Sequence, residues 1–166
     1  MLFDNKLETL DDLLLMCLKD LYSAETQLLD ALPQMAAASK DGRLRRGFER
    51  HLRETEEQVK RLERIGQELQ LDLGGETCAA MQGLIKEGQK LMSENATEEV
   101  MDAALIGASQ KIEHYEIACY GTAAHYADRL GYTSAADLLR KTLEEEQLTD
   151  TKLNELAKNY LNKKAE

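Results

Sequence analysis

The chain of 166 residues is short enough for one domain, and with one proline, no tryptophan and only two phenylalanines its composition is typical of an all-α protein. Its formal net charge of -10 argues against a nucleic-acid partner, because phosphate binding requires an excess of Lys and Arg. The same negative charge favours solubility and attracts metal cations.

The cysteines and the hydropathy indicate the compartment. Cys17, Cys78 and Cys119 are odd in number and form no Cys-x-x-Cys pair, so we expect a reducing environment rather than a disulfide framework. The first residues, 1–12, are too rich in acids for a signal peptide. No apolar run approaches the roughly 18 residues that a membrane span requires. We therefore expect a cytoplasmic protein with no membrane partner.

The spacing of apolar residues predicts four long helices and one short helix. The first spans about 5–39, the second 43–71 and the short third 76–92, and the fourth, capped by Thr97, reaches about Leu130, where Gly131 stops it. Thr133 or Ser134 caps the last, after which only 162–166 remain. The chain, 1–166, should form a single domain, an antiparallel four-helix bundle with an additional short connector helix packed across its outside.

Several acids occupy positions that helical periodicity assigns to the core. Glu116 shares a stripe with Ile112, and Glu113 lies one turn earlier on nearly the same face. The stripes of the first and last helices contain Glu25 and Glu146. A buried carboxylate without a partner costs several kcal/mol, so we expect a cation beside these acids.

The second helix carries a polar patch in its middle. His51, Thr55 and Gln58 interrupt its apolar stripe, and Glu54 shares a face with His51 and Gln58. An amide such as that of Gln58 would be a weak neutral ligand at best.

The chain also repeats itself. Residues 51–55 align without gaps on 142–146, and the segment around Glu25 aligns on that around Glu116. The repeat predicts two helical hairpins, each with acids at mid-height, that associate about a pseudo-twofold axis.

Antiparallel helices that direct carboxylates inward at one level form the arrangement used for two Glu-bridged metal ions. Oxygen ligands suit iron or manganese, so we expect two iron ions, with manganese as the other metal that fits. The alternative is that the acids point sideways into salt bridges with Arg53, Arg61, Lys111 or Lys152. The candidate metal ligands are Glu25, His51, Glu54, Glu113, Glu116, Glu145 and Glu146.

A set of motifs resembles the YciE/YciF family of bacterial ferritin-like proteins, most closely its YciF type. The motifs are Tyr22-Ser-Ala-Glu25, His51-Leu-x-Glu54-Thr55-x-x-Gln58, Asp102-Ala-Ala-Leu-Ile, Gln110-Lys-x-Glu113-His-Tyr-Glu116-Ile-Ala, Tyr120-Gly-Thr and Thr142-Leu-Glu-Glu-Glu146. The likeness covers nearly the whole chain. It implies a ferritin-like bundle, a homodimer, a role in stress responses and a di-metal centre.

The chain departs from the usual ferritin-like signature, in which Glu is followed by His three residues later. In the corresponding places Glu57, Glu116 and Thr149 stand where His would be. His51 precedes Glu54 by three residues, so it is either a ligand from the other side or a residue that orients a carboxylate. The missing imidazoles lower the affinity for iron, favour manganese, or leave an empty scaffold whose acids share protons.

The remaining candidates are expected to play smaller parts. We expect His114 to face solvent and Cys17 and Cys119 to pack as small core residues. Three tyrosines, Tyr22, Tyr115 and Tyr120, have two alternative roles: they form hydrogen bonds near a metal, or they serve only in packing.

Two functions of different classes follow from these observations. The first is a di-iron protein that oxidises Fe(II) or consumes oxygen or peroxide, and the second is a metal-free helical interaction protein that acts as a dimer. A storage cage is not expected, because residues 162–166 are too few for a further packing helix.

Overall fold

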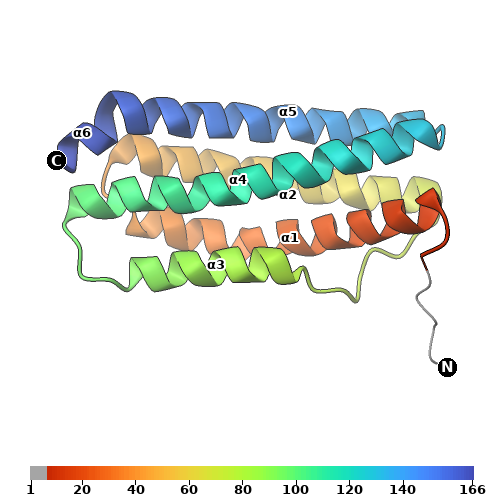
Figure 1. Cartoon of the computed structure of the whole chain (residues 1–166), viewed down its shortest axis with the longest axis horizontal. Coiled ribbons are helices and arrows are strands. Elements are labelled where there is room, and N and C mark those ends of the chain that lie inside the picture. Colours follow the sequence, from red (N-terminus) through yellow and green to blue (C-terminus); the bar gives the residue numbers. More distant parts are fainter. Residues whose placement is uncertain (1–6) are drawn as a thin grey trace.

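The computed structural model describes residues 7–166, and it contains no strand in that range (Figure 1). Its helices are α1 (Leu10–Ala38), α2 (Gly42–Leu69), α3 (Ala79–Met92), α4 (Glu98–Arg129) and α5 (Thr133–Leu156). A π-helical turn, Ala157–Leu161, and a last short turn, α6 (Asn162–Lys164), continue α5. The expected all-α class is confirmed.

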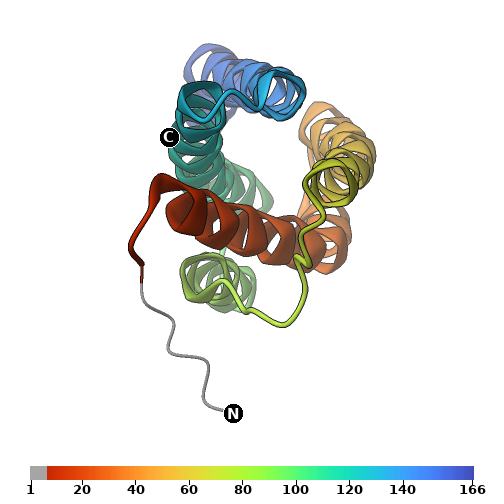
Figure 2. The same ribbon diagram turned by 90° about the vertical axis from the view of Figure 1, so that its right-hand side faces the viewer.

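The long helices α1, α2, α4 and α5 surround a common axis, as the end-on view in Figure 2 shows. Each runs antiparallel to both of its neighbours, and α3 lies outside this ring against α1 and α4 (Figure 1). By carrying the chain back along the bundle, α3 allows α4 to start at the same end as α2. The predicted four-helix bundle with an outer connector helix is therefore confirmed.

Helix α1 begins at Leu10, later than the apolar spacing predicted. Residues 5 and 6 lie outside the described residues, and residues 7–9 are not helical. A capping box sets the start: Thr9 Oγ1 accepts from the Asp12 backbone N–H (3.2 Å), and Asp12 Oδ2 accepts from that of Thr9 (2.8 Å). The predicted start was wrong: Leu7 fits the apolar spacing of the helix, but the capping box at Thr9 makes Leu10 the first helical residue.

The other helix ends follow local hydrogen bonds in the same way. Thr97 caps α4 as predicted, with Oγ1 accepting from the Val100 N–H at 3.4 Å. Gly131 ends the helix at a φ of 80°, a left-handed conformation that suits glycine. The predicted cap of α5 was wrong: Tyr132 holds that position and its side chain makes no capping hydrogen bond, while Ser134 donates to Glu68.

The buried apolar side chains form two clusters. One includes Leu28, Phe48 and Leu105, and the other includes Leu18 and Tyr120. Along each long helix, buried polar residues lie between these two clusters. We call this set the polar layer; it consists of Glu25, His51, Thr55, Gln58, Glu113, Glu116, Thr142, Glu146 and Thr149.

Candidate metal centre

The polar layer contains four carboxylates with no exposure to solvent. Glu25 comes from α1, Glu113 and Glu116 from α4, and Glu146 from α5, and each is 0% exposed. His51 of α2 is 2% exposed. The layer therefore draws titratable side chains from all four long helices, at the level that the sequence predicted.

Four of these residues converge on one place. His51, Glu113, Glu116 and Glu146 each present a ligand atom, and these atoms all lie within 4.8 Å of one another. The His51 Nε2 atom is 3.4 Å from Glu113 Oε1 and 3.8 Å from Glu146 Oε2. One imidazole and three carboxylates form a donor set suited to iron or manganese.

The polar layer is short of hydrogen-bond partners. Among the described residues, every buried side-chain nitrogen or oxygen without a partner belongs to the layer or to the adjacent Glu54. Glu116 has no partner for either oxygen, and His51 has none for either nitrogen. Native proteins rarely leave buried polar atoms unpaired, because each one costs about 1–3 kcal/mol. A cation bound among them would satisfy both the lone pairs and the charge.

Burial changes the protonation of this cluster. It raises the pKa of Glu25 to about 8, with the charge of Glu146 adding to the effect, and it raises the pKa of Glu113 to about 8. The pKa values of Glu116 and Glu146 also rise, again chiefly because of burial. For His51, burial lowers the pKa, but the charge of Glu146 and other nearby acids raises it overall. Without a cation, the cluster therefore retains protons at neutral pH.

Neighbouring side chains fix the orientation of the carboxylates. The hydroxyl of Tyr120 donates to Glu25 Oε1, and Ser109 Oγ donates to Glu113 Oε1 at 3.2 Å. The Gln58 amide donates to Glu146 Oε1. Sequence reasoning left the role of Tyr120 open and missed Ser109, although its position four residues before Glu113 places both on one helix face.

Glu54 and Glu145 lie at the edge of the polar layer. The Glu54 side chain is 28% exposed, and its Oε2 is 3.7 Å from His51 Nδ1. Burial raises the pKa of Glu54, but His51, Arg50 and Lys152 lower it overall. Both oxygens of Glu145 accept from Arg61, at 2.6 and 2.7 Å. For Glu145 the structure thus contains the salt bridge that the sequence left open as the alternative to metal binding.

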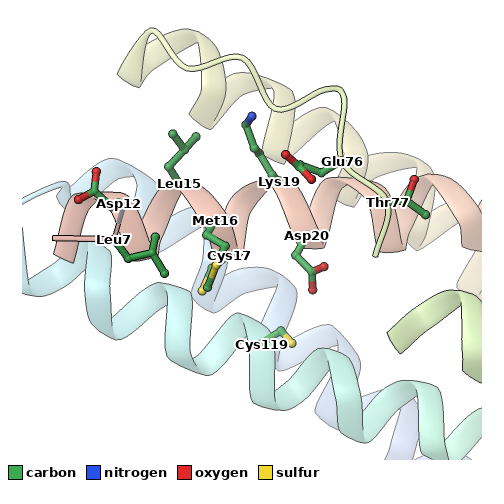
Figure 3. A pocket seen from close by; sticks show the side chains of 10 residues that line it. All are labelled: Leu7, Asp12, Leu15, Met16, Cys17, Lys19, Asp20, Glu76, Thr77 and Cys119. Atoms are coloured by element: carbon green, nitrogen blue, oxygen red, sulfur yellow. The ribbon is translucent and has the colours of Figure 1, made fainter. Parts of the chain in front are cut away.

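The remaining predicted residues lie away from the polar layer. His114 is 69% exposed and pairs with Asp150 at 3.3 Å, as expected for a solvent-facing residue. Cys17 and Cys119 are only partly buried and line a groove of about 630 Å³ beside α1 (Figure 3). No candidate ligand lines this groove. Tyr115 donates to Asp20, another residue of the groove wall.

Within residues 7–166, no helix is both long and apolar enough to cross a bilayer.

Comparison with known proteins gives a consistent assignment. The family model described as a domain of unknown function, DUF892, matches residues 9–166. Protein YciF of Escherichia coli strain K12 is 47% identical over 161 residues, which are 96% of this chain and 97% of the relative. The crystal structure of the Escherichia coli stress protein YciF matches with a TM-score of 0.91 at 46% identity, covering 95% of this chain and 99% of that chain.

Two further solved structures extend the comparison. YcfI of Rhodopseudomonas palustris, described as a candidate structural protein, has a TM-score of 0.88 at 40% identity over 92% of this chain and 97% of its own. A Xanthomonas campestris protein, at 22% identity and a TM-score of 0.73, shares the fold over 92% of this chain and 93% of its own. The chain belongs to the DUF892 family and, within it, to the YciF-like proteins that its motifs resemble.

Proposed function

We propose that this chain is a stress-response protein that holds two iron or manganese ions in the polar layer and uses them to oxidise Fe(II) or to consume oxygen or peroxide. The observation that carries the proposal is the set of buried ligand atoms without partners, which includes both oxygens of Glu116 and both nitrogens of His51. The stress role is taken from the Escherichia coli relative. The proposal also takes the protein to be a cytoplasmic homodimer.

The donor atoms suggest which residues would hold the ions. His51, Glu113, Glu116 and Glu146 would form the firmer site, because their ligand atoms already converge. Glu25, whose Oε2 is buried without a partner and whose charge acts on Glu116, would help to hold the second ion. When bound, the ions would supply one-electron redox chemistry and Lewis acidity toward oxygen or peroxide.

The chain's own residues would support this chemistry in two ways. Tyr120 and Ser109 each donate to one carboxylate oxygen and leave the second oxygen of that carboxylate free to bind a cation. The apolar clusters on both sides of the layer exclude bulk water, which strengthens the attraction between cation and carboxylate.

Metal analysis tests the proposal directly. Protein purified without chelator and reconstituted with Fe(II) or Mn(II) is expected to bind about two ions per chain. Added metal should also raise the melting temperature relative to EDTA, because a ligand that binds only the folded state stabilises it. No bound metal and no shift at saturating concentrations would contradict the proposal.

A metal-free interaction protein is the second candidate. Two observations favour it: the description of the Rhodopseudomonas relative as a candidate structural protein, and the absence of Glu-x-x-His motifs from the sequence. The raised pKa values of Glu25 and Glu113 would then keep these two acids protonated without any ion. Equal melting temperatures with EDTA and with metal would favour this function over the first.

A further inference from the structure

Two carboxylates lie at the edge of the polar layer along the line where α2 faces α5. The internal repeat relates them: Glu54 of α2 corresponds to Glu145 of α5, and Arg61 of α2 corresponds to Lys152 of α5. Because α2 and α5 run antiparallel, Arg61 lies across from Glu145, and Lys152 lies across from Glu54. The two halves of this edge would be equivalent if the repeat were perfect.

The Glu145 half is closed by a firm ion pair. Arg61 donates to both Glu145 oxygens, at 2.6 and 2.7 Å, and to Thr142 Oγ1 at 3.1 Å. Gln58 Nε2 adds a bond to Glu145 Oε2 at 3.1 Å. A bidentate Arg–carboxylate pair holds a defined geometry, and these four bonds tie the two helices together at this point.

The Glu54 half has no such closure. Lys152 replaces the arginine and acts on Glu54 through its charge, without an ion pair between them among those of the described residues. The other cation near Glu54, Arg50, has its Nε 3.9 Å from Oε1. The Glu54 side chain is 28% exposed, yet its Oε2 is buried, accepts no hydrogen bond and lies 3.7 Å from His51 Nδ1. This side chain therefore reaches from the surface to the cluster of ligands.

The two halves differ in this way because the repeat has different residues at two pairs of corresponding positions. Thr142 gives Arg61 an extra acceptor on the closed half, while His51 in the corresponding place belongs to the cluster. A lysine ammonium cannot bind a carboxylate through two parallel bonds as a guanidinium does. The α2–α5 edge is thus held closed at Glu145 by the Arg61 ion pair, whereas no such pair holds it closed at Glu54.

We propose that Glu54 is the access gate of the metal centre, the acid that takes divalent cations from solvent and passes them to His51 and the buried carboxylates. The Arg61–Glu145 pair keeps the opposite half shut, so cations enter and leave on the Glu54 side alone. This inference rests on the proposed function, since it assigns a route to the site described there.

The repeat itself supplies the decisive variant. Lys152→Arg places a guanidinium opposite Glu54, where it copies the Arg61–Glu145 lock without changing the charge. Opening a charge-assisted pair costs about 1.5–3 kcal/mol, so Co(II) or Mn(II) association should slow about tenfold or more. Dissociation should slow by the same factor, which leaves Kd unchanged. Stopped-flow absorbance of Co(II), with Kd from equilibrium dialysis, measures both quantities without any assay of activity.

Matched variants complete the experiment. Lys141→Arg, an exposed change on the same helix, should leave both rates at the wild-type value. Arg61→Lys should speed association, because it opens the closed half. If metal ions associate with Lys152→Arg at the wild-type rate, or associate more slowly but dissociate at an unchanged rate, Glu54 is not the access gate. Absence of equilibrium binding to the wild-type protein would instead overturn the proposed function, so the two failures are distinguishable.

Discussion

Glu116 is the acid whose removal best separates an occupied site from an empty one. Both of its oxygens are buried without a partner, and burial together with the charge of Glu25 raises its pKa. Because the raised pKa of Glu116 opposes its ionisation in the metal-free protein, Glu116→Gln removes this cost and should stabilise the apo form at pH 7. In the metal-bound protein the same change removes a ligand and should lower both stability and affinity.

Thermal melts with EDTA and with saturating Mn(II) measure the two effects. We expect the variant to melt higher than wild type in EDTA and lower in metal, and Glu25→Gln to behave in the same way. The exposed Glu155→Gln serves as control and should shift little, in the same direction under both conditions. Parallel shifts of Glu116→Gln in the two conditions would contradict metal binding by this residue.

For single residues, the sequence predicts burial but not the contacts that a side chain makes with another helix. Helical periodicity predicted burial for Glu25, Glu116 and Glu146, because an acid on an apolar stripe has no other direction to point. It could not decide the role of Glu145, the neighbour of Glu146, since that depends on whether Arg61 reaches across from another helix. Side-chain contacts between helices leave no periodic signal.

At the scale of the helices, the turn between α1 and α2 depends on a residue of α4. Asp102 is 3% exposed, and its carboxylate accepts the backbone N–H groups of Lys40 (2.8 Å) and Asp41 (2.7 Å). Asp102→Ala leaves both donors without this partner, so we expect the free energy of unfolding to fall by about 2–3 kcal/mol. Urea denaturation measures the change.

A second acid provides the comparison for Asp102. Asp30 is exposed, and its replacement by Ala should change the free energy of unfolding by less than about 0.5 kcal/mol. Asp102→Asn keeps one acceptor oxygen, so its change in the free energy of unfolding should lie between those of Asp30→Ala and Asp102→Ala. A wild-type unfolding curve for Asp102→Ala would show that the turn is held by other contacts.

The helices themselves were predictable, and their ends were less so. A period of 3.6 identifies long amphipathic segments, so the order of the four long helices and the short connector helix agrees with the structure, whereas the π-helical turn and α6 at the end of α5 were not predicted. Ends depend on a few hydrogen bonds: Thr97 was recognised as a cap, whereas the capping box of Thr9 and Asp12 was not. The link from Asp102 to the α1–α2 turn joins residues far apart in the sequence, and no local pattern indicates it.

For the whole molecule, the polar layer makes the stability of the apo protein depend on pH in an unusual direction. The pKa of Glu25 and of Glu113 rises from 4.5 to about 8 on folding, so the folded state binds more protons than the unfolded chain between these values. The stability that these groups contribute is fully present below pH 4.5 and is lost as the pH rises through about 8. His51, whose pKa is also raised, acts in the same direction.

We therefore expect the melting temperature in EDTA to fall as the pH rises from about 5.5 to 8.5. Acids with lowered pKa values, such as Asp12 and Glu68, lose their contribution only below their unfolded values and do not act in this window. Saturating Mn(II) should reverse the trend, because a cation replaces the protons and binds more tightly as they leave. The double variant Glu25→Gln/Glu113→Gln should flatten the curve in EDTA. A melting temperature in EDTA that rises across this range would show that the buried acids are ionised in the apo protein, and hence that a partner other than protons neutralises them.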